Sequence, residues 1–260
     1  MAAGICNLSM IPVRKEASHQ SEMVSQLLFG ESYTILETQN DWARICMNYD
    51  GYEGFISSGQ LKPIEDEEFN KLLLNDKNFT LDVVQVVYNT SRNFTQGIFI
   101  GSSLPQVENE TFSLAGEIYL IKGLLSKNIP EGTTREMIIE ENIRKFIQAP
   151  YLWGGRTPFG IDCSGLVQII YKLCGIKLPR DASEQSKLGE TIYFINDAKP
   201  GDLMFFDNQE QQITHTGIYL GNNQIVHSSG WVKIDDVDTT GIFNKDKQIY
   251  THNLRVIKRV

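Results

Sequence analysis

Three residues of this sequence have side chains that together suit nucleophilic catalysis. Cys163 lies in the run Ile161-Asp162-Cys163-Ser164-Gly165, and His215 and His227 follow in two later segments. A free thiol is only a few per cent thiolate near neutral pH, so a hydrolytic cysteine needs a neighbouring base, a cation or a helix N-terminus. The pattern predicts a nucleophile, a general base and a residue that orients the base, in the order Cys163, His215, His227.

The segment that follows Cys163 has the apolar spacing of an amphipathic helix. Apolar residues recur at helical intervals over 166–174, and Gly175 suits the position just after a helix. Asp162 and Ser164 are typical of helix starts, which places Cys163 in the first turn. There, unpaired backbone N–H groups and the helix dipole are expected to lower the thiol pKa and to bind the oxyanion of a tetrahedral intermediate.

The two histidines lie in segments with strand-like patterns. Short apolar runs separated by Gly and Asn turns cover 201–206, 214–221 and 224–228. Asn222-Asn223 predicts a hairpin that brings His215 and His227 together across a sheet. A buried cysteine or a strand histidine, taken singly, is more often structural. The joint pattern favours catalysis, whereas His19 and His252 lack such a context and are expected to be structural.

Five separated blocks make the second half of the chain resemble the NlpC/p60 family of bacterial cell-wall cysteine peptidases. These blocks are 149–155, 160–165, 178–180 with Gln185, 200–203 and 215–219. The resemblance implies a compact papain-like α+β fold and cleavage of peptidoglycan stem peptides between D-glutamate and a diamino acid. It also implies that Cys163 is the nucleophile, His215 the general base and His227 the polar third member. The residues around Cys163 do not match the local sequence signature of papain. The likeness to papain therefore concerns the architecture of the fold and the roles of the catalytic residues.

The same resemblance implies roles for three residues near Cys163. Tyr151 matches a tyrosine that helps to bind the oxyanion. Asp162 matches an acid that pairs with the substrate α-ammonium in relatives that require a free N-terminal L-alanine, and Ser164 belongs with it in the predicted substrate-binding set. A simple helix cap is the alternative role for Asp162, and the two roles are compatible.

Composition limits the class of protein. The 260 residues suffice for a large core and more than one domain. A hydrophobic content of 41% with 22% charged residues is typical of a globular protein, and no apolar run reaches membrane-spanning length. The net charge of −8 argues against nucleic-acid binding and against tight adhesion to anionic wall polymers. The charge therefore favours a small soluble fragment as the substrate, and the family resemblance implies that this fragment is a peptidoglycan-derived peptide. We expect no membrane partner and a monomer.

The start of the chain and its cysteines bear on the compartment. Residues 1–6 lack a basic region followed by an apolar stretch, so no secretory signal is expected in the sequence as it stands. Four scattered cysteines do not make a disulfide framework, which favours a reducing compartment. The expected location is cytoplasmic, or periplasmic or secreted if a signal has been removed.

The first part of the chain has a different pattern from the second. Short strands are predicted over 10–14, 33–37, 42–47 and 52–56, which suggests a small barrel. The stretch with Gly30-Glu31, Trp42 and 51–56 resembles a bacterial SH3-like (SH3b) domain. The predicted domains are therefore an SH3b-like domain over 1–63, a helical linker with a second, diverged SH3b-like domain over 64–127, and the peptidase domain over 128–260, whose first helix is expected over 134–148.

Two SH3b-like units before an NlpC/p60 domain resemble the γ-D-glutamyl-L-diamino acid endopeptidases of muropeptide recycling. The resemblance implies that the first unit closes one end of the groove and recognises the free amino terminus of L-Ala-γ-D-Glu-diamino acid. A buried ammonium needs carboxylate or hydroxyl partners. The candidates on this unit are Tyr52 and one of Glu16 and Glu22. Both meso-diaminopimelate and lysine remain open as the diamino acid.

Two other functions compete with peptide hydrolysis. One is a wall-binding protein in which SH3b units bind and the peptidase domain is a spent scaffold, although the intact set of Cys163, His215 and His227 speaks against it. The other is amidase or acyltransferase chemistry, because an acyl-enzyme does not itself choose water as acceptor. The three residues would also suit zinc, but a cysteine at a helix start favours catalysis with neither metal nor cofactor.

Overall fold

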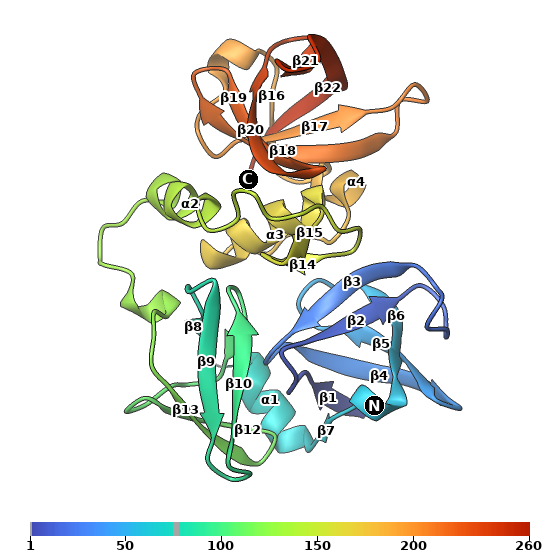
Figure 1. Ribbon diagram of the computed structural model, residues 1–260, viewed down its shortest axis with the longest axis vertical. Coiled ribbons are helices and arrows are strands. Elements are labelled where there is room, and N and C mark those ends of the chain that lie inside the picture. Colours follow the sequence, from blue (N-terminus) through green and yellow to red (C-terminus); the bar gives the residue numbers. More distant parts are fainter. Residues whose placement is uncertain (1, 75–77) are drawn as a thin grey trace. The chain divides into compact units, whose positions relative to one another are not determined.

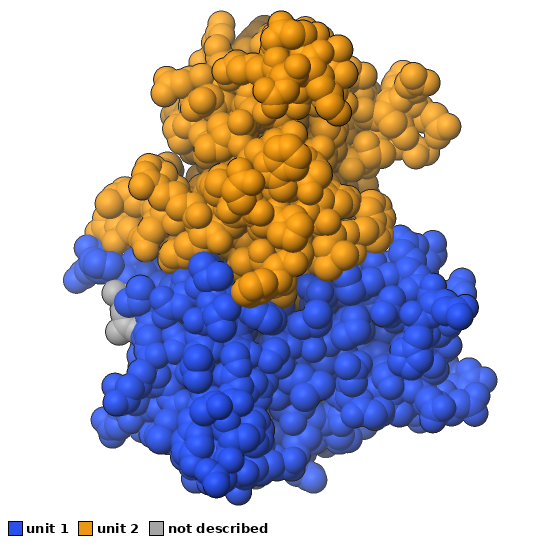
Figure 2. Space-filling model, in the orientation of Figure 1, with its two compact units in different colours: residues 1–131 blue, residues 132–260 orange. Residues whose placement is uncertain are grey.

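The computed structural model describes residues 2–74 and 78–260, and it divides the chain into two compact units, Met1–Glu131 and Gly132–Val260 (Figure 2). Strands dominate both units, and the described residues form four α-helices (Figure 1). The predicted boundary at residue 128 lies close to the observed division. The predicted domains over 1–63 and 64–127 fall within one unit.

The first unit begins with a seven-stranded antiparallel sheet. Its strands are β1 (Ala3–Ile5), β2 (Met10–Arg14), β3 (Met23–Leu28), β4 (Ser32–Gln39), β5 (Trp42–Met47), β6 (Glu53–Ser57) and β7 (Pro63–Ile64), in the order β3-β2-β6-β5-β4-β1-β7. A 3-10 turn over Ser58–Gln60 follows β6. Buried and less buried residues alternate along β2 and β5, as expected when one face of a strand meets a core. The four strands predicted from the sequence are confirmed as β2, β4, β5 and β6, while β1, β3 and β7 had not been predicted.

The rest of the first unit combines one helix with smaller sheets. It contains α1 (Asp66–Leu74), β8 (Asn78–Phe79), β9 (Val84–Asn89), β10 (Phe94–Phe99), β11 (Ser103–Leu104), β12 (Thr111–Leu114), β13 (Glu117–Ile121) and a 3-10 turn over Ser126–Asn128. A four-stranded sheet has the order β10-β9-β13-β12, and β11 pairs with β8. Its core includes Ile5 of β1 and Phe29, which directly follows β3, beside Phe112 and Tyr119, and this shared core explains why 1–131 is one unit. That residues 64–127 form a second SH3b-like domain stays a prediction.

The second unit is built on a closed antiparallel barrel. Its strands are β16 (Glu190–Ile192), β17 (Leu203–Asp207), β18 (Ile213–Gly221), β19 (Gln224–Ser229), β20 (Trp231–Val237), β21 (Gly241–Asn244) and β22 (Ile249–Arg259). The order is β16-β22-β17-β18-β19-β20-β21, and β21 also pairs with β22, which closes the ring (Figure 1). An apolar cluster that includes Phe206, Tyr219 and Ile225 fills the interior.

Helices and short strands precede the barrel along the chain. They are α2 (Arg135–Ile143), β14 (Arg156–Thr157), β15 (Gly160–Ile161), α3 (Cys163–Leu173), α4 (Ala182–Gln185) and a 3-10 turn over Ile195–Asp197. Helix α3 is buried along its whole length and packs against β18 and β19. The predicted helix after Cys163 is thus confirmed, with Gly175 in the left-handed conformation just beyond it (φ 76°).

The structure also tests the predicted hairpin and the predicted first helix. Asn222 and Asn223 connect β18 to β19 with φ of 52° and 57°, as a tight hairpin turn requires, so the hairpin is confirmed. Helix α2 ends at Ile143 rather than at residue 148. Its buried apolar positions are Ile139 and Ile143, whereas Met137 is 58% exposed, because residues four apart share a helix face and Met137 lies off that face.

None of the helices in residues 2–74 and 78–260 combines the length and the apolar character needed to cross a membrane.

Candidate active site

Cys163 is the first residue of helix α3, and the chain around it is tightly held. Asp162 is the N-cap, with extended backbone, and its Oδ1 accepts a hydrogen bond of 2.7 Å from the N–H of Gly165. Ser228 Oγ on β19 donates to the carbonyl of Ile161 at 2.8 Å, which ties the strand before the helix to the barrel. A capping carboxylate and a strand contact thus place the thiol at a helix N-terminus next to the barrel.

The electrostatic surroundings of the thiol differ from the expectation. Burial raises the pKa of Cys163 to about 12, and the neighbouring Asp162 carboxylate adds to this rise. Backbone N–H groups of Thr216 and Ser164 donate to the sulfur and oppose it, but they do not outweigh burial. The expectation that the helix start leaves Cys163 with a lowered pKa was therefore wrong, because the thiol is only 7% exposed. The resting cysteine is a protonated thiol that needs a base.

The barrel brings His215 and His227 into direct contact. In the β18–β19 ladder Gly217 lies opposite His227, so His215 is its diagonal neighbour on the same face. His215 Nε2 lies 2.9 Å from His227 Nδ1, and both rings are buried. Thr216, the residue after His215, donates its backbone N–H to the Cys163 sulfur. With Nε2 of His215 facing His227, Nδ1 is the ring nitrogen of His215 that does not take part in this contact.

The histidine rings are held in the neutral form. Burial lowers the pKa of His215 well below its ordinary value, and His252, His227 and Lys233 lower it further. Burial also lowers the pKa of His227, although its hydrogen bond to Asp235 acts in the opposite direction. A neutral imidazole is the form that accepts a proton, so His215 has the protonation state that a general base requires near neutral pH.

Two further residues of the barrel contact the histidine pair. His227 Nε2 lies 3.1 Å from Asp235 Oδ2 on β20. The ring of His252 on β22 stacks on His215, with centroids 4.0 Å apart and an angle of 25° between the planes. Burial, followed by the charges of His227 and Lys233, lowers the pKa of His252 to about 4. The expectation that His252 has no place near the site was wrong, because closure of β21 on β22 carries it there.

The same three histidines offer a possible metal-binding set. One ring nitrogen from each of His215, His227 and His252 lies within 4.8 Å of the others. Four of their six ring nitrogens already face hydrogen-bond partners: His215 with His227, His227 with Asp235, and His252 with the Thr251 hydroxyl at 2.8 Å. A metal ion would have to replace these bonds, so the donor set suits proton transfer better than metal binding. The absence of a metal requirement stays a prediction.

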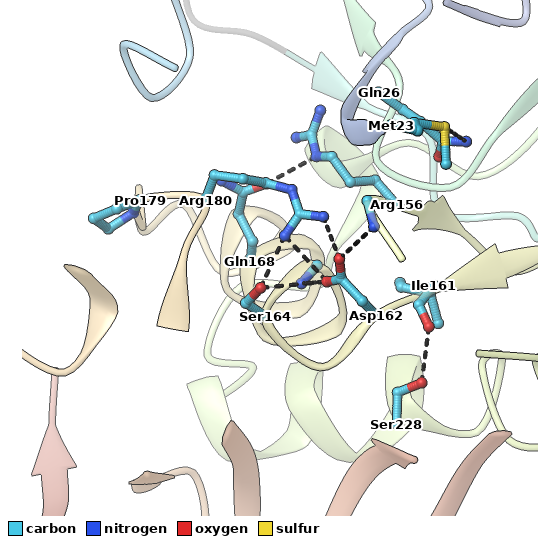
Figure 3. Close-up of polar contacts among 12 residues, drawn as sticks. Met23, Gln26, Arg156, Ile161, Asp162, Ser164, Gln168, Pro179, Arg180 and Ser228 are labelled. Atoms are coloured by element: carbon cyan, nitrogen blue, oxygen red, sulfur yellow. Dashed lines mark hydrogen bonds and ion pairs between the residues drawn. The ribbon is translucent and has the colours of Figure 1, made fainter. Parts of the chain in front are cut away.

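A buried ion pair supports the start of α3. Arg180 donates through Nη1 and Nη2 to the two carboxylate oxygens of Asp162, and through Nη1 to Ser164 Oγ at 2.8 Å (Figure 3). The N–H of Gly154 also donates to Asp162 Oδ2, at 2.8 Å. A substrate ammonium would therefore share this carboxylate with Arg180. The predicted substrate contacts of Asp162 and Ser164 stay predictions.

Tyr151 lies on the segment that leads into this site. Its backbone N–H donates to the carbonyl of Gly230 at 2.9 Å, which attaches the segment to the turn after β19. Burial, followed by the charges of Cys163 and Asp162, raises the pKa of Tyr151 to about 12. Its hydroxyl keeps its proton near neutral pH and is available as a donor, as a role in oxyanion binding would require.

The three candidates on the first unit lie on its surface or at its margin. Tyr52 packs half-buried against the core of the first sheet, and its N–H donates to Asp50 Oδ1 at 3.0 Å. Glu16 is exposed, and Glu22 is 3.4 Å from Lys15 in an exposed ion pair. Their contacts within the unit do not single out a substrate-binding residue, so their roles stay predictions.

Sequence reasoning had assigned no role to Arg180, Asp235 or His252. Arg180 belongs to the segment 178–180, one of the segments on which the family resemblance rests, so the sequence contained a signal for Arg180. A turn at Gly230 (φ 76°) sets the register between β19 and β20, and this register places Asp235 diagonally opposite His227. Gly230 was therefore the signal in the sequence that could have indicated Asp235. For His252 the sequence held no comparable signal, because its position depends on the closing of the barrel.

Comparisons with known proteins identify relatives of both parts of the chain. The sequence profile of the NlpC/P60 family matches residues 148–251, and that of the bacterial dipeptidyl-peptidase Sh3 domain matches residues 13–61. The chain is 30% identical over 221 residues to a gamma-D-glutamyl-L-lysine dipeptidyl-peptidase of Bacillus subtilis, covering 78% of this chain and 71% of that protein. It is also 30% identical over 234 residues to dipeptidyl-peptidase 6 of Lysinibacillus sphaericus, covering 82% and 83%.

A solved structure has a similar fold. The crystal structure of an NlpC/P60 family protein from Bacillus cereus superposes with a TM-score of 0.82 over 99% of both chains, at 20% sequence identity. Similarity at this identity speaks for the fold, while the relatives at 30% identity speak for the family. The chain therefore belongs to the NlpC/P60 family of peptidases, with an SH3-like domain before its peptidase domain.

Proposed function

We propose that this peptidase is a cysteine endopeptidase that hydrolyses the bond between γ-D-glutamate and the L-diamino acid of peptidoglycan stem peptides. The observation that carries the proposal is the placement of Cys163 at the start of α3, bonded to the backbone of β18 beside the His215–His227 pair. The names of the relatives, gamma-D-glutamyl-L-lysine dipeptidyl-peptidases, support this substrate class.

The first chemical step follows from the protonation states. His215 Nδ1 takes the proton of the Cys163 thiol as the sulfur attacks the γ-carbonyl carbon of the D-glutamyl residue. Burial disfavours both the free thiolate and the free imidazolium, so we propose that proton transfer accompanies the attack. The imidazolium of His215 then protonates the leaving amine of the diamino acid. Water attacks the resulting thioester, with His215 again as the base.

The oxyanion of the tetrahedral intermediate needs donors beside the sulfur. The first turn of α3 presents backbone N–H groups there, and the protonated hydroxyl of Tyr151 supplies a side-chain donor. Donors that point at the developing negative charge stabilise the transition state more than the substrate. We assign the oxyanion to this set.

The preferred substrate is a fragment with a free N-terminal L-alanine, as in muropeptide recycling. The word dipeptidyl-peptidase in the names of the relatives denotes release of two residues from a free amino terminus, which supports this preference. Asp162 is a candidate partner for the α-ammonium, shared with Arg180. Tyr52 and one of Glu16 and Glu22 are candidates from the SH3-like domain.

The proposal is tested with the tripeptides L-Ala-γ-D-Glu-L-Lys and L-Ala-γ-D-Glu-meso-diaminopimelate. Release of the free diamino acid is measured by mass spectrometry for the wild type and for Cys163→Ala, in excess chelator. We expect cleavage by the wild type and a loss of at least about 10³-fold in Cys163→Ala. Cys174→Ala, at the other end of the same helix, is the matched control and should keep wild-type activity.

Release of the diamino acid by Cys163→Ala at the wild-type rate would refute the cysteine mechanism. N-acetylation of the L-alanine tests the substrate preference separately. We expect it to raise KM sharply or to abolish cleavage, because the acetyl group removes the positive charge that a carboxylate would bind. Equal kinetics for both substrates would reject the preference and leave the reaction type intact.

A further inference from the structure

Asp235 stands at the end of a row of three side chains that begins at His215 and continues through His227. His215 Nε2 lies 2.9 Å from His227 Nδ1, and His227 Nε2 lies 3.1 Å from Asp235 Oδ2. In the β19–β20 ladder His227 is opposite Lys233, so Asp235 is its diagonal neighbour on the same face. The strands therefore hold the Asp235 carboxylate at a fixed position beside the His227 ring.

The positions of the hydrogen atoms on these three side chains can be assigned by starting from Asp235. An ionised carboxylate only accepts hydrogen bonds, so His227 carries its proton on Nε2. In a neutral imidazole the other nitrogen is then an acceptor, and His227 Nδ1 accepts from His215 Nε2–H. His215 Nδ1 is consequently free of a proton. The tautomer of the general base is thus set two hydrogen bonds away from it.

We propose that Asp235 is a positioning residue that selects the tautomers of His227 and His215 and so keeps His215 Nδ1 ready to accept the proton of Cys163. This role rests on the proposed cysteine mechanism. Asp235 is separated from His215 by two hydrogen bonds and acts through His227, as the third residue of a serine triad acts through its histidine.

The groups around Asp235 favour its ionised form. Lys233 Nζ lies 3.4 Å from Asp235 Oδ2, and the side chain of Asp235 is 15% exposed. The hydrogen bond with His227 lowers the pKa of Asp235, and the charges of His227 and Lys233 lower it further. The other titratable group that faces the histidine pair is His252, stacked on His215. Near neutral pH the carboxylate is therefore an obligatory acceptor.

The informative substitution is Asp235→Asn, which keeps the shape and adds an N–H donor. An amide that donates to His227 Nε2 moves the His227 proton to Nδ1, which reverses the next bond and places a proton on His215 Nδ1. We expect kcat on L-Ala-γ-D-Glu-L-Lys to fall about 10²- to 10⁴-fold with KM little changed. Asp235→Glu should recover part of the loss.

Asp236→Asn is the matched control, because it makes the same change at the next residue. Asp236 forms a half-exposed ion pair with Lys245, 2.8 Å away, on the other face of β20. We expect wild-type kcat for this variant. Equal losses in Asp235→Asn and Asp236→Asn would mean that charge alone, and not the hydrogen bond to His227, is responsible.

Nitrogen-15 NMR of the histidine rings tests the proposal without relying on activity. In the wild type near pH 7.5 we expect the Nε2–H tautomer for both His215 and His227, and the Nδ1–H tautomer for both in Asp235→Asn. Nδ1–H tautomers in the wild type would overturn the proposal even if Asp235→Asn did not fold. Failure of Cys163→Ala to lose activity would instead remove the cysteine mechanism, while the tautomer result would still stand.

Discussion

Cys6 in the first unit and Cys163 in the second are both buried thiols whose pKa burial raises, yet their hydrogen-bond partners differ. The Cys6 sulfur donates to the carbonyl oxygens of Leu8 and Leu27, at 3.3 and 3.7 Å, and these acceptors require the thiol form. Cys163 receives N–H groups from Ser164 and Thr216, the residue after His215 on β18, whereas Cys6 receives one from Leu8. Burial alone therefore does not identify a nucleophile; the full set of hydrogen-bond partners and the nearby histidines distinguish the two thiols.

The two units also differ in how deeply an arginine–carboxylate ion pair is buried. Arg44 and Glu53 bridge β5 and β6 on the surface, with side chains 44% and 49% exposed. Arg180 and Asp162 form their pair with side chains 2% and 8% exposed. A pair in water contributes little to stability, whereas removal of one partner of a buried pair leaves an uncompensated charge. The site region therefore depends on its ion pair, and the surface of the first sheet does not.

The largest expected effect is on stability. Arg180→Met removes the partner of Asp162, and we expect the free energy of unfolding to fall by about 3–5 kcal/mol in urea titrations. Arg44→Met is the matched control and should leave the unfolding midpoint nearly unchanged, because its pair is exposed. A comparable loss in both variants would show that burial does not separate the two pairs.

The next largest effect concerns the two thiols. At pH 7.5 we expect iodoacetamide to modify Cys163 at least about 100-fold faster than Cys6, since two N–H groups and the proposed base His215 support a thiolate at Cys163, whereas the Cys6 sulfur donates to two carbonyl oxygens. Peptide mass spectrometry of the native protein over time measures both rates in one sample. Similar rates at the two positions would contradict the comparison.

The smallest effect concerns His252, whose ring stacks on His215, the proposed general base. Loss of the stack in His252→Ala is expected to lower kcat about two- to tenfold, corresponding to about 0.5–1.5 kcal/mol for a ring–ring contact. His252→Phe keeps a ring and should keep most of kcat. His19→Ala, which removes the contact of His19 with Trp42 in the first unit, should leave kcat unchanged.

The pH profile supplies a second readout for the same variants. His215 works as a base only when neutral, and its pKa is lowered, so the acid limb of kcat/KM should lie below pH 6.5 in the wild type. His252 contributes to that lowering, so both His252→Ala and His252→Phe should move the acid limb to higher pH. If the acid limb of kcat/KM lies at the same pH in the variants as in the wild type, His252 acts through packing only.

Local patterns carried the sequence predictions that succeeded. The helix after Cys163 needs only an N-cap, an apolar stripe and Gly175, which are neighbours along the chain. The hairpin at Asn222-Asn223 is likewise set by residues that adopt positive φ easily. Nucleophile and histidine pair could therefore be predicted together, because a helix start and a two-residue turn place them.

Only the tertiary structure decided the rest, because the remaining features depend on burial and on strands far apart in sequence. Closure of β21 on β22 brings His252 onto His215, and the pairing of β19 with β20 brings Asp235 to His227. The sign of the Cys163 pKa shift reversed because desolvation, which a sequence does not reveal, outweighs the helix N-terminus. The residue types and their order along the chain predict a thiol with two histidines; packing decides where the protons lie.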